Sequence, residues 1–298
     1  MSILLFVLSF MVQPTDPWLA TPSFPARWMG DARPKSAPQR IVTVAPSITE
    51  ILFALGQGSH VVGVTRFDDF PPEADLLPEI GGFLDPSVEK ILELKADLVI
   101  AAPNASNRVP LAKLVSLGTP VLVVPGNGFA DLFHSIDAIG TAVRAEPEAR
   151  ALGDRLRAEV RALIAVPRPK TRVVVVYDRN PLIVGGPGSF ADTLVRLLGA
   201  ENVVKVQSEY PTYSREQLLV DAPEVLIDAS LTHWTKTGTS SPALAPMDGA
   251  NAEFWKTFAS LPAVRDHRVY GITGSELLRP GPRLTAGMRR LAEVLERK

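Results

Sequence analysis

The amino-acid sequence predicts an α/β protein with two similar lobes. Each lobe is expected to contain a mainly parallel sheet, one long rigid helix is expected to join them, and a ligand cleft is expected between them. Three observations support this class. Short apolar runs alternate with amphipathic segments from residue 40 onward, a helical pattern runs without interruption through residues 146–165, and a segment of the first half recurs in the second half.

In the first half, residues 41–45 (IVTVA) form the first expected strand. Ser47 and Glu50 have the spacing of a capping box before the run ILFALG, so a helix is expected from Ser47 to Gly56. Further strands are expected at residues 61–65, 98–102 and 121–124, and further helices at 87–94, 109–117 and 129–143. This alternation predicts an N-terminal lobe over residues 40–144.

Between the halves, Leu152, Leu156, Val160 and Leu163 recur at helical spacing, which predicts the linking helix over residues 146–165. Pro167 and Pro169 end it. The pattern then restarts in a C-terminal lobe over residues 170–298. Strands are expected at 172–177 and 225–227, and helices at 189–198, 214–219 and 284–295.

The restart is an internal repeat. Residues 87–100 (SVEKILELKADLVI) and 214–227 (SREQLLVDAPEVLI) align without a gap. The repeat places Glu89 and Glu216 at the same position, two residues after a serine N-cap. Acidic residues in a first helical turn stabilise the helix through its dipole, and this alone is enough to explain the two glutamates. A matched pair, one per lobe, also offers a symmetric partner two separated negative charges that set the docking register.

The first 39 residues are expected to be a leader or linker. Residues 3–12 (ILLFVLSFMV) are too short to span a bilayer and match the apolar core of a secretory signal, with residues 1–26 as the candidate signal peptide. No Lys or Arg precedes the run, so a disordered or misassigned N-terminus is the alternative. The folded part is expected to begin near Arg40.

Composition narrows the function classes. Hydrophobic residues make up 46% and charged residues 21%, which excludes disorder of the whole chain. The 31 Lys and Arg balance 32 Asp and Glu, which argues against a nucleic-acid partner. There is no cysteine and the four histidines are scattered, so no resident metal site or cofactor is expected. Without a cysteine to carry lipid, a soluble periplasmic form is expected rather than a tethered one.

Residues 40–56 (RIVTVAPSITEILFALG), 61–72 (VVGVTRFDDFPP) and 81–98 (GGFLDPSVEKILELKADL) closely resemble the N-terminal lobe of the cobalamin and iron–siderophore substrate-binding proteins of ABC importers. Residues 213–218 (YSREQL) and 279–284 (RPGPRL) resemble the C-terminal lobe of that family. The resemblance covers about residues 40–298, with the motifs in the family's order and spacing.

The resemblance implies a monomer without catalytic activity or membrane insertion. It would capture a corrinoid in its cleft, or alternatively a ferric siderophore or haem. It implies that Glu89 and Glu216 dock onto basic residues of an ABC permease dimer in the inner membrane. The positions that match ligand contacts are Pro46, Ser47, Phe67, Asp69, Phe70, Phe83, Tyr177, Tyr210, Arg279 and Arg283. Phe and Tyr stand here where cobalamin binders tend to have Tyr and Trp, which leaves the chelate open.

The sequence alone leaves other classes of function open. A serine hydrolase is disfavoured because the sequence contains no G-x-S-x-G elbow. Glu89 and Glu216 are paired acids of the kind that glycosidases use, although their places in separate lobes favour an outward position. A third possibility is a domain whose closure signals to a membrane receptor instead of delivering cargo.

Overall fold

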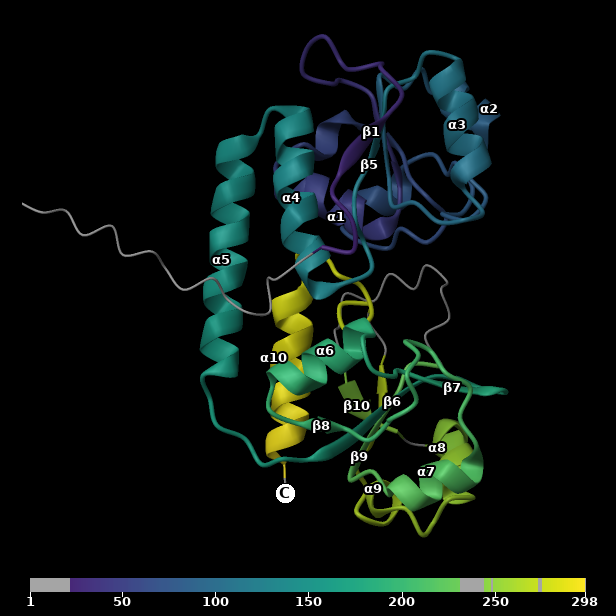
Figure 1. The fold of residues 1–298 in the computed structure, drawn as a ribbon, viewed down its shortest axis with the longest axis vertical. Coiled ribbons are helices and arrows are strands. Elements are labelled where there is room, and N and C mark those ends of the chain that lie inside the picture. Colours follow the sequence, from purple (N-terminus) through teal and green to yellow (C-terminus); the bar gives the residue numbers. More distant parts are fainter. Residues whose placement is uncertain (1–21, 231–243, 248, 273–274, 298) are drawn as a thin grey trace, which may run out of the picture.

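The computed structural model describes residues 22–230, 244–247, 249–272 and 275–297. Two lobes follow one another along the long axis, and helix α5 (Glu146–Ile164) runs beside both of them (Figure 1). The helix expected at residues 146–165 is confirmed, with Ala165 as its C-cap.

The N-terminal lobe contains a five-stranded sheet in the order β1-β5-β4-β2-β3. Its strands are β1 (Arg27–Met29), β2 (Ile41–Val44), β3 (Val61–Gly63), β4 (Leu98–Ala101) and β5 (Val121–Val123). All pairings are parallel except that of the edge strand β1 with β5. The helices are α1 (Pro46–Ala54), α2 (Val88–Glu93), α3 (Arg108–Ser116) and α4 (Phe129–Val143), with short 3-10 turns at Gly58–His60 and Ala74–Leu76.

Alternation along the strands gives this sheet two apolar faces. Ile41 and Leu98 pack towards α1 and α4, whereas Val42 and Val99 pack towards α2 and α3. A strand covered on both faces needs apolar residues at every position, which explains the unbroken apolar runs of the sequence.

The C-terminal lobe has a second sheet in the order β10-β11-β9-β6-β7, with β8 also paired to β6. Its strands are β6 (Arg172–Arg179), β7 (Leu182–Val184), β8 (Glu201–Asn202), β9 (Val225–Asp228), β10 (Leu244–Pro246) and β11 (Val269–Ile272). Its helices are α6 (Phe190–Leu197), α7 (Arg215–Asp221), α8 (Gly249–Lys256), α9 (Pro262–Arg265) and α10 (Leu284–Glu296). Pairings β6–β8, β6–β9 and β9–β11 are parallel, while β7 and β10 pair antiparallel.

The two sheets confirm the predicted repeat. The parallel order β4-β2-β3 of the first lobe corresponds to β9-β6-β8 of the second, and α2 corresponds to α7. In each lobe an antiparallel strand, β1 or β10, closes the edge beyond this set. The likeness therefore extends beyond the residues whose sequences visibly repeat.

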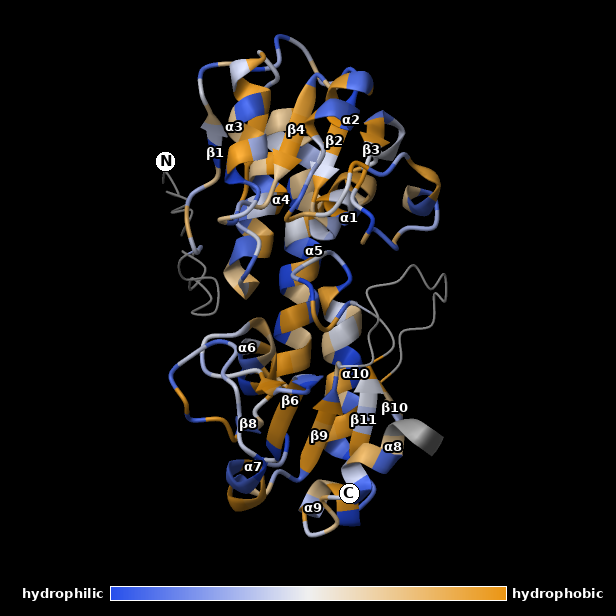
Figure 2. Cartoon of the chain, turned by 90° about the vertical axis from the view of Figure 1, so that its right-hand side faces the viewer, coloured by the Kyte–Doolittle hydropathy of each residue, from blue (hydrophilic) through white to orange (hydrophobic). Residues whose placement is uncertain are grey.

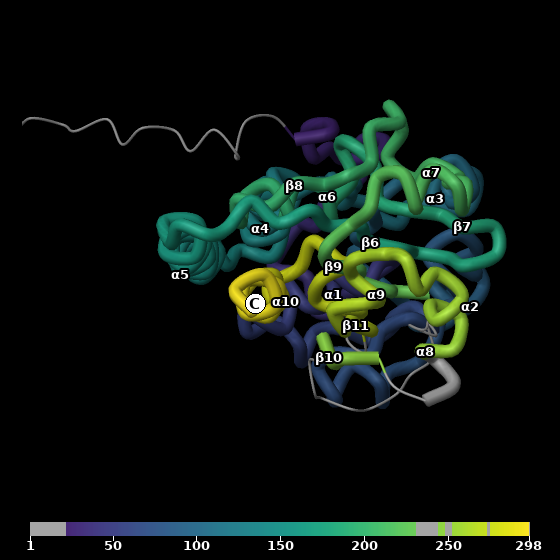
Figure 3. Tube along the Cα trace, turned by 90° about the horizontal axis from the view of Figure 1, so that it is seen from below, coloured from purple at the N-terminus to yellow at the C-terminus, as the bar shows by residue number. Residues whose placement is uncertain are grey.

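One apolar core runs through both lobes. Ile48 and Phe133 of the first lobe belong to the same buried cluster as Leu194 and Met288 of the second, with Leu156 of α5 between them. Figure 2 shows the strands as mainly hydrophobic, and Figure 3 shows α5 and α10 side by side along one edge of the molecule. Thr285 of α10 donates a hydrogen bond to Glu159 of α5.

The folded part begins before Arg40, contrary to the sequence-based expectation. Strand β1 pairs with β5 from Arg27 to Met29, and the backbone N–H of Ser23 donates to buried Asp131 at 2.7 Å. Strand β5 would otherwise be an open sheet edge, and β1 satisfies its backbone groups. The candidate apolar signal segment, residues 3–12, lies outside the described residues.

Candidate functional site

The loops that follow the carboxyl ends of β3 and β11 meet at the boundary between the lobes. Arg279, after β11, donates to the carboxylate of Asp69 at 2.7 Å and to the backbone carbonyl of Phe67 at 3.1 Å. Ligands of parallel α/β sheets bind outside the carboxyl ends of the strands. This boundary, where loops that follow parallel strands of both lobes meet, is therefore the candidate ligand site.

On the N-terminal side, an aromatic pair lies at this boundary. The rings of Phe67 and Phe83 meet edge to face at 6.1 Å, and Phe83 is 38% exposed. Buried Asn107 fixes the Phe83 loop, because its side-chain amide donates to the carbonyls of Phe83 at 2.9 Å and Ala102 at 3.0 Å. Arg66 lies over the ring of Phe67 at 4.9 Å. The pair presents apolar ring surface on a braced loop.

On the C-terminal side, a second aromatic pair lies near the end of β6. Tyr177 and Tyr210 meet edge to face at 5.2 Å. Burial raises the pKa of Tyr177, and Tyr210 adds a smaller increase. Burial also raises the pKa of Tyr210, and the negative charge of Glu209 adds a smaller increase. Both phenols are therefore neutral at physiological pH and act as ring surface with a hydroxyl group.

The two predicted arginines are already engaged by carboxylates of the protein. Arg279 is 9% exposed and pairs with Asp69, which is itself one of the predicted ligand contacts. Arg283 pairs with Glu50 of α1 at 2.6 Å, and its guanidinium lies over the ring of Phe70 at 4.2 Å. Both ion pairs join the two lobes, because buried Arg279 and half-buried Arg283 find carboxylates in the N-terminal lobe, while Arg283 also contacts Glu276 of its own lobe.

Glu50 is the residue that sequence reasoning placed wrongly. The expected capping box is absent: α1 begins at Pro46, its N-cap is Ala45, and Ala45 makes no side-chain cap. Proline is favoured at the first helical position because its missing N–H is not needed there. Glu50 therefore lies on the buried face of α1, only 3% exposed, and burial raises its pKa although Arg283 opposes the shift. Pro46 and Ser47 lie half-buried in the first turn, directly after β2.

Glu89 and Glu216 occupy matching, exposed positions outside this boundary. Each lies in the first turn of its helix after a serine N-cap. Ser87 accepts from the N–H of Lys90 at 3.3 Å, and Ser214 accepts from the N–H of Gln217 at 3.0 Å. Helices α2 and α7 both lie on the side of the molecule away from α5 (Figures 1 and 3).

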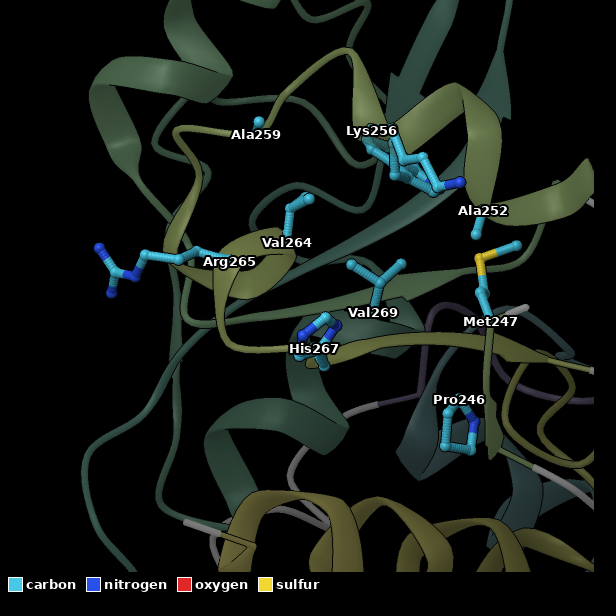
Figure 4. Close-up of a pocket in the computed structure, with 10 residues that line it drawn as sticks. Pro246, Met247, Ala252, Lys256, Ala259, Val264, Arg265, His267 and Val269 are labelled. Carbon is cyan, nitrogen blue, oxygen red and sulfur yellow. The ribbon is translucent and has the colours of Figure 1, made fainter. Parts of the chain in front are cut away.

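Two pockets differ in their relation to the predicted set. One of about 490 Å³ lies in the C-terminal lobe among α8, α9, β10 and β11, and Figure 4 shows His267, Lys256 and Arg265 among its lining. Its lining shares no residue with the predicted ligand contacts. The other, of about 330 Å³, lies at the lobe boundary and includes Glu50, Phe70 and Pro282.

Within the part of the chain that the structure describes, no cluster of three His, Cys, Asp or Glu side chains is placed to hold a metal ion. None of the described helices has both the length and the apolarity that crossing a bilayer requires.

Comparisons with known proteins agree with this arrangement. A vitamin B12-binding protein of Vibrio cholerae serotype O1 is 30% identical over 265 residues, covering 87% of this chain and 89% of that protein. The uncharacterized ABC transporter substrate-binding lipoprotein YvrC of Bacillus subtilis is 28% identical, covering 89% of this chain and 82% of that protein. The periplasmic heme-binding protein RhuT from Roseiflexus sp. RS-1, in apo form, has a TM-score of 0.75 at 25% identity, covering 87% of this chain and 98% of that one.

The family model described as "Periplasmic binding protein" matches residues 41–275, most of the chain and parts of both lobes. The family consists of binding proteins, so the hydrolase and glycosidase alternatives are set aside. With two repeated lobes, parallel sheets whose carboxyl ends meet and one continuous family match, this chain belongs to the periplasmic binding protein family.

Proposed function

We propose that this protein is the substrate-binding component of an ABC importer and that it captures a corrinoid between its lobes. The proposal rests on two aromatic pairs, one in each lobe. Phe67 contacts Phe83 in the N-terminal lobe, and Tyr177 contacts Tyr210 in the C-terminal lobe. Ring faces from two sides suit a flat macrocycle, because aromatic contacts add to the free energy of apolar burial. The vitamin B12-binding relative of Vibrio cholerae supports this choice.

Among the predicted contacts, the aromatic residues supply the ligand surface in this proposal, with Pro46 and Ser47 beside them. Asp69, Arg279 and Arg283 contribute indirectly, because their ion pairs join the two lobes that supply the aromatic pairs. The protein acts in the periplasm as a monomer, and a permease dimer in the inner membrane receives the chelate.

A ferric chelate or haem is the second candidate, supported by the likeness to the heme-binding protein of Roseiflexus. A tyrosine can bind iron as phenolate, so Tyr177 and Tyr210 could serve either ligand.

A ligand panel tests the proposal. The purified protein is titrated with cyanocobalamin, dicyanocobinamide, haemin and a set of ferric siderophores, by calorimetry and absorbance. We expect one corrinoid per chain with micromolar or tighter affinity. Binding of haemin or a siderophore alone supports the second candidate and overturns the first. Binding of none of them overturns both.

Docking is proposed to depend on Glu89 and Glu216. We expect the double variant E89A/E216A to retain ligand affinity and to lose uptake through the cognate permease. The control variant E146A/E148A removes two exposed acids from the first turn of α5, on the opposite side, and should keep uptake. Equal uptake by the two double variants would refute this role.

A further inference from the structure

The two docking helices carry a second matched feature beside their glutamates. In the gapless repeat, Leu92 of α2 corresponds to Leu219 of α7, as Glu89 corresponds to Glu216. Both leucine residues are 41% exposed. In each helix the leucine stands three residues after the glutamate, so the two side chains share one face about one turn apart.

Packing within the lobes does not account for these leucines. The preceding residue of each helix, Ile91 or Leu218, is fully buried and anchors its helix to the sheet. Scattered exposed apolar side chains need no explanation. Here, however, the exposed leucine recurs at the same position of two repeated helices. In both helices it lies beside an exposed carboxylate, so the two leucines form a matched pair. Val220, 76% exposed, enlarges the apolar surface on α7.

The neighbouring cations leave the charge of the glutamates available. Lys90 donates to the backbone carbonyl of Glu79 at 3.2 Å. Arg215 donates to Thr257 at 2.8 Å and lies over the ring of Phe258 at 4.5 Å. Among the described residues, neither Glu89 nor Glu216 is within ion-pair distance of a basic side chain.

We propose that Leu92 and Leu219, with Val220 beside the latter, are the apolar half of a bipartite docking epitope. This rests on the proposed docking role of Glu89 and Glu216. The partner that fits is a two-fold pair of like membrane subunits. Each subunit presents a basic side chain to a glutamate and, one helical turn further, an apolar hollow to a leucine. Each lobe thus offers the same charge-plus-leucine pair to one subunit.

The two halves have different kinetic roles. Exposed charges steer encounter and set register, and salt screens them. Apolar side chains that lose water in the complex slow its dissociation, and salt screens them little. The glutamates therefore control the association rate and its salt dependence, and the leucines control the residence time.

Surface plasmon resonance on the cognate permease in lipid nanodiscs separates these roles, with each variant tested with cyanocobalamin and without it over a series of salt concentrations. We expect L92S/L219S to dissociate about 10-fold faster or more, with the salt dependence of association unchanged. We expect E89Q/E216Q to associate more slowly, with a flatter salt dependence. The control L76S/V166S removes two exposed apolar side chains elsewhere, which are 85% and 47% exposed, and should behave as the parent protein.

If L92S/L219S dissociates at the rate of the control while E89Q/E216Q is impaired, the leucine inference is overturned and the proposed docking face stands. If neither variant differs from the control, the docking face itself is wrong. Circular dichroism and ligand titration of each variant establish that folding and ligand binding are intact.

Discussion

Arg283 and Glu50 form a two-bond ion pair across the boundary between the lobes. The guanidinium Nη2 lies 2.6 Å from one carboxylate oxygen of Glu50, and Nε lies 3.0 Å from the other. Glu50 comes from the first helix of the N-terminal lobe and Arg283 from the segment before the last helix, 233 residues later. The pair therefore joins the two ends of the fold.

Replacing Arg283 with Met is expected to lower the free energy of unfolding by about 3 kcal/mol, because it leaves the buried carboxylate of Glu50 without its counter-charge. Urea denaturation followed by circular dichroism measures this. The control Arg290→Met removes an exposed partner of Glu293 on the same helix and should change stability by less than about 0.5 kcal/mol. Similar losses in the two variants would contradict the prediction.

Asp68 is expected to make stability depend on pH. Its side chain is fully buried and accepts a hydrogen bond from the N–H of Thr65 at 2.9 Å, and burial raises its pKa to about 6 from 3.8. The folded protein then binds the proton more tightly than the unfolded chain. The stabilisation is complete below about pH 4 and is lost as the pH rises to about 6, a fall of about 2 to 3 kcal/mol.

Urea titrations of the parent protein and of Asp68→Asn, at several values between pH 4 and pH 7, isolate this contribution. Asn keeps an oxygen that accepts from Thr65 but has no proton to lose. The stability difference between the two proteins should shift across this window in favour of the variant at high pH. A difference that stays constant with pH would remove Asp68 as the cause.

Asp131 is expected to hold the N-terminal strand on the sheet. Its carboxylate accepts hydrogen bonds from the backbone N–H and side-chain hydroxyl of Ser23 and from the backbone N–H groups of Asn127 and Gly128. Asp131→Ala should cost about 2 kcal/mol, because buried donors lose a charged acceptor. Hydrogen exchange of peptides that cover residues 22–30 should accelerate. Ser23→Ala, which removes only one hydroxyl, should have a smaller effect on both the stability and the hydrogen exchange.

The aromatic pairs are expected to carry ligand affinity. Phe83→Ala removes a 38% exposed ring and should weaken binding of the identified ligand by about 10-fold with little loss of stability. Leu76→Ala, which shortens an 85% exposed side chain in the same lobe, serves as the control. Equal affinities of the two variants, measured by calorimetry, would exclude Phe83 from the site.

Elements with strong local signals were predictable from the sequence. Helix α4 was predicted from residue 129 to residue 143, as found, because its apolar period and its Gly128 boundary agree. Strands β7, β10 and β11 and helices α8 and α9 were missed. All of them are short. Strand β11 also pairs with a distant segment, since its Val269 lies opposite Leu226, whereas β7 pairs with the adjacent strand β6 and is only three residues long. Pairing between distant segments leaves no local pattern to read.

The candidate site shows the same limit. The sequence separates Glu50 from Arg283 and gives Glu50 a plausible local role as part of a capping box. Tertiary contact overrides that local role, because the buried carboxylate of Glu50 pairs with a guanidinium from the far end of the chain. Glu89 and Glu216, by contrast, were placed correctly on the surface, since the serine N-caps and the repeat fix both helix starts locally.

The apolar cluster that passes through both lobes bears on how this protein unfolds. Proteins of two duplicated halves commonly melt in two steps, because each half has a core of its own. Here Ile48, Leu156 and Met288 belong to one continuous cluster. Exposing the core of either lobe therefore exposes part of the other. We therefore expect the two lobes to unfold together in one cooperative transition, although each also has a smaller apolar cluster of its own.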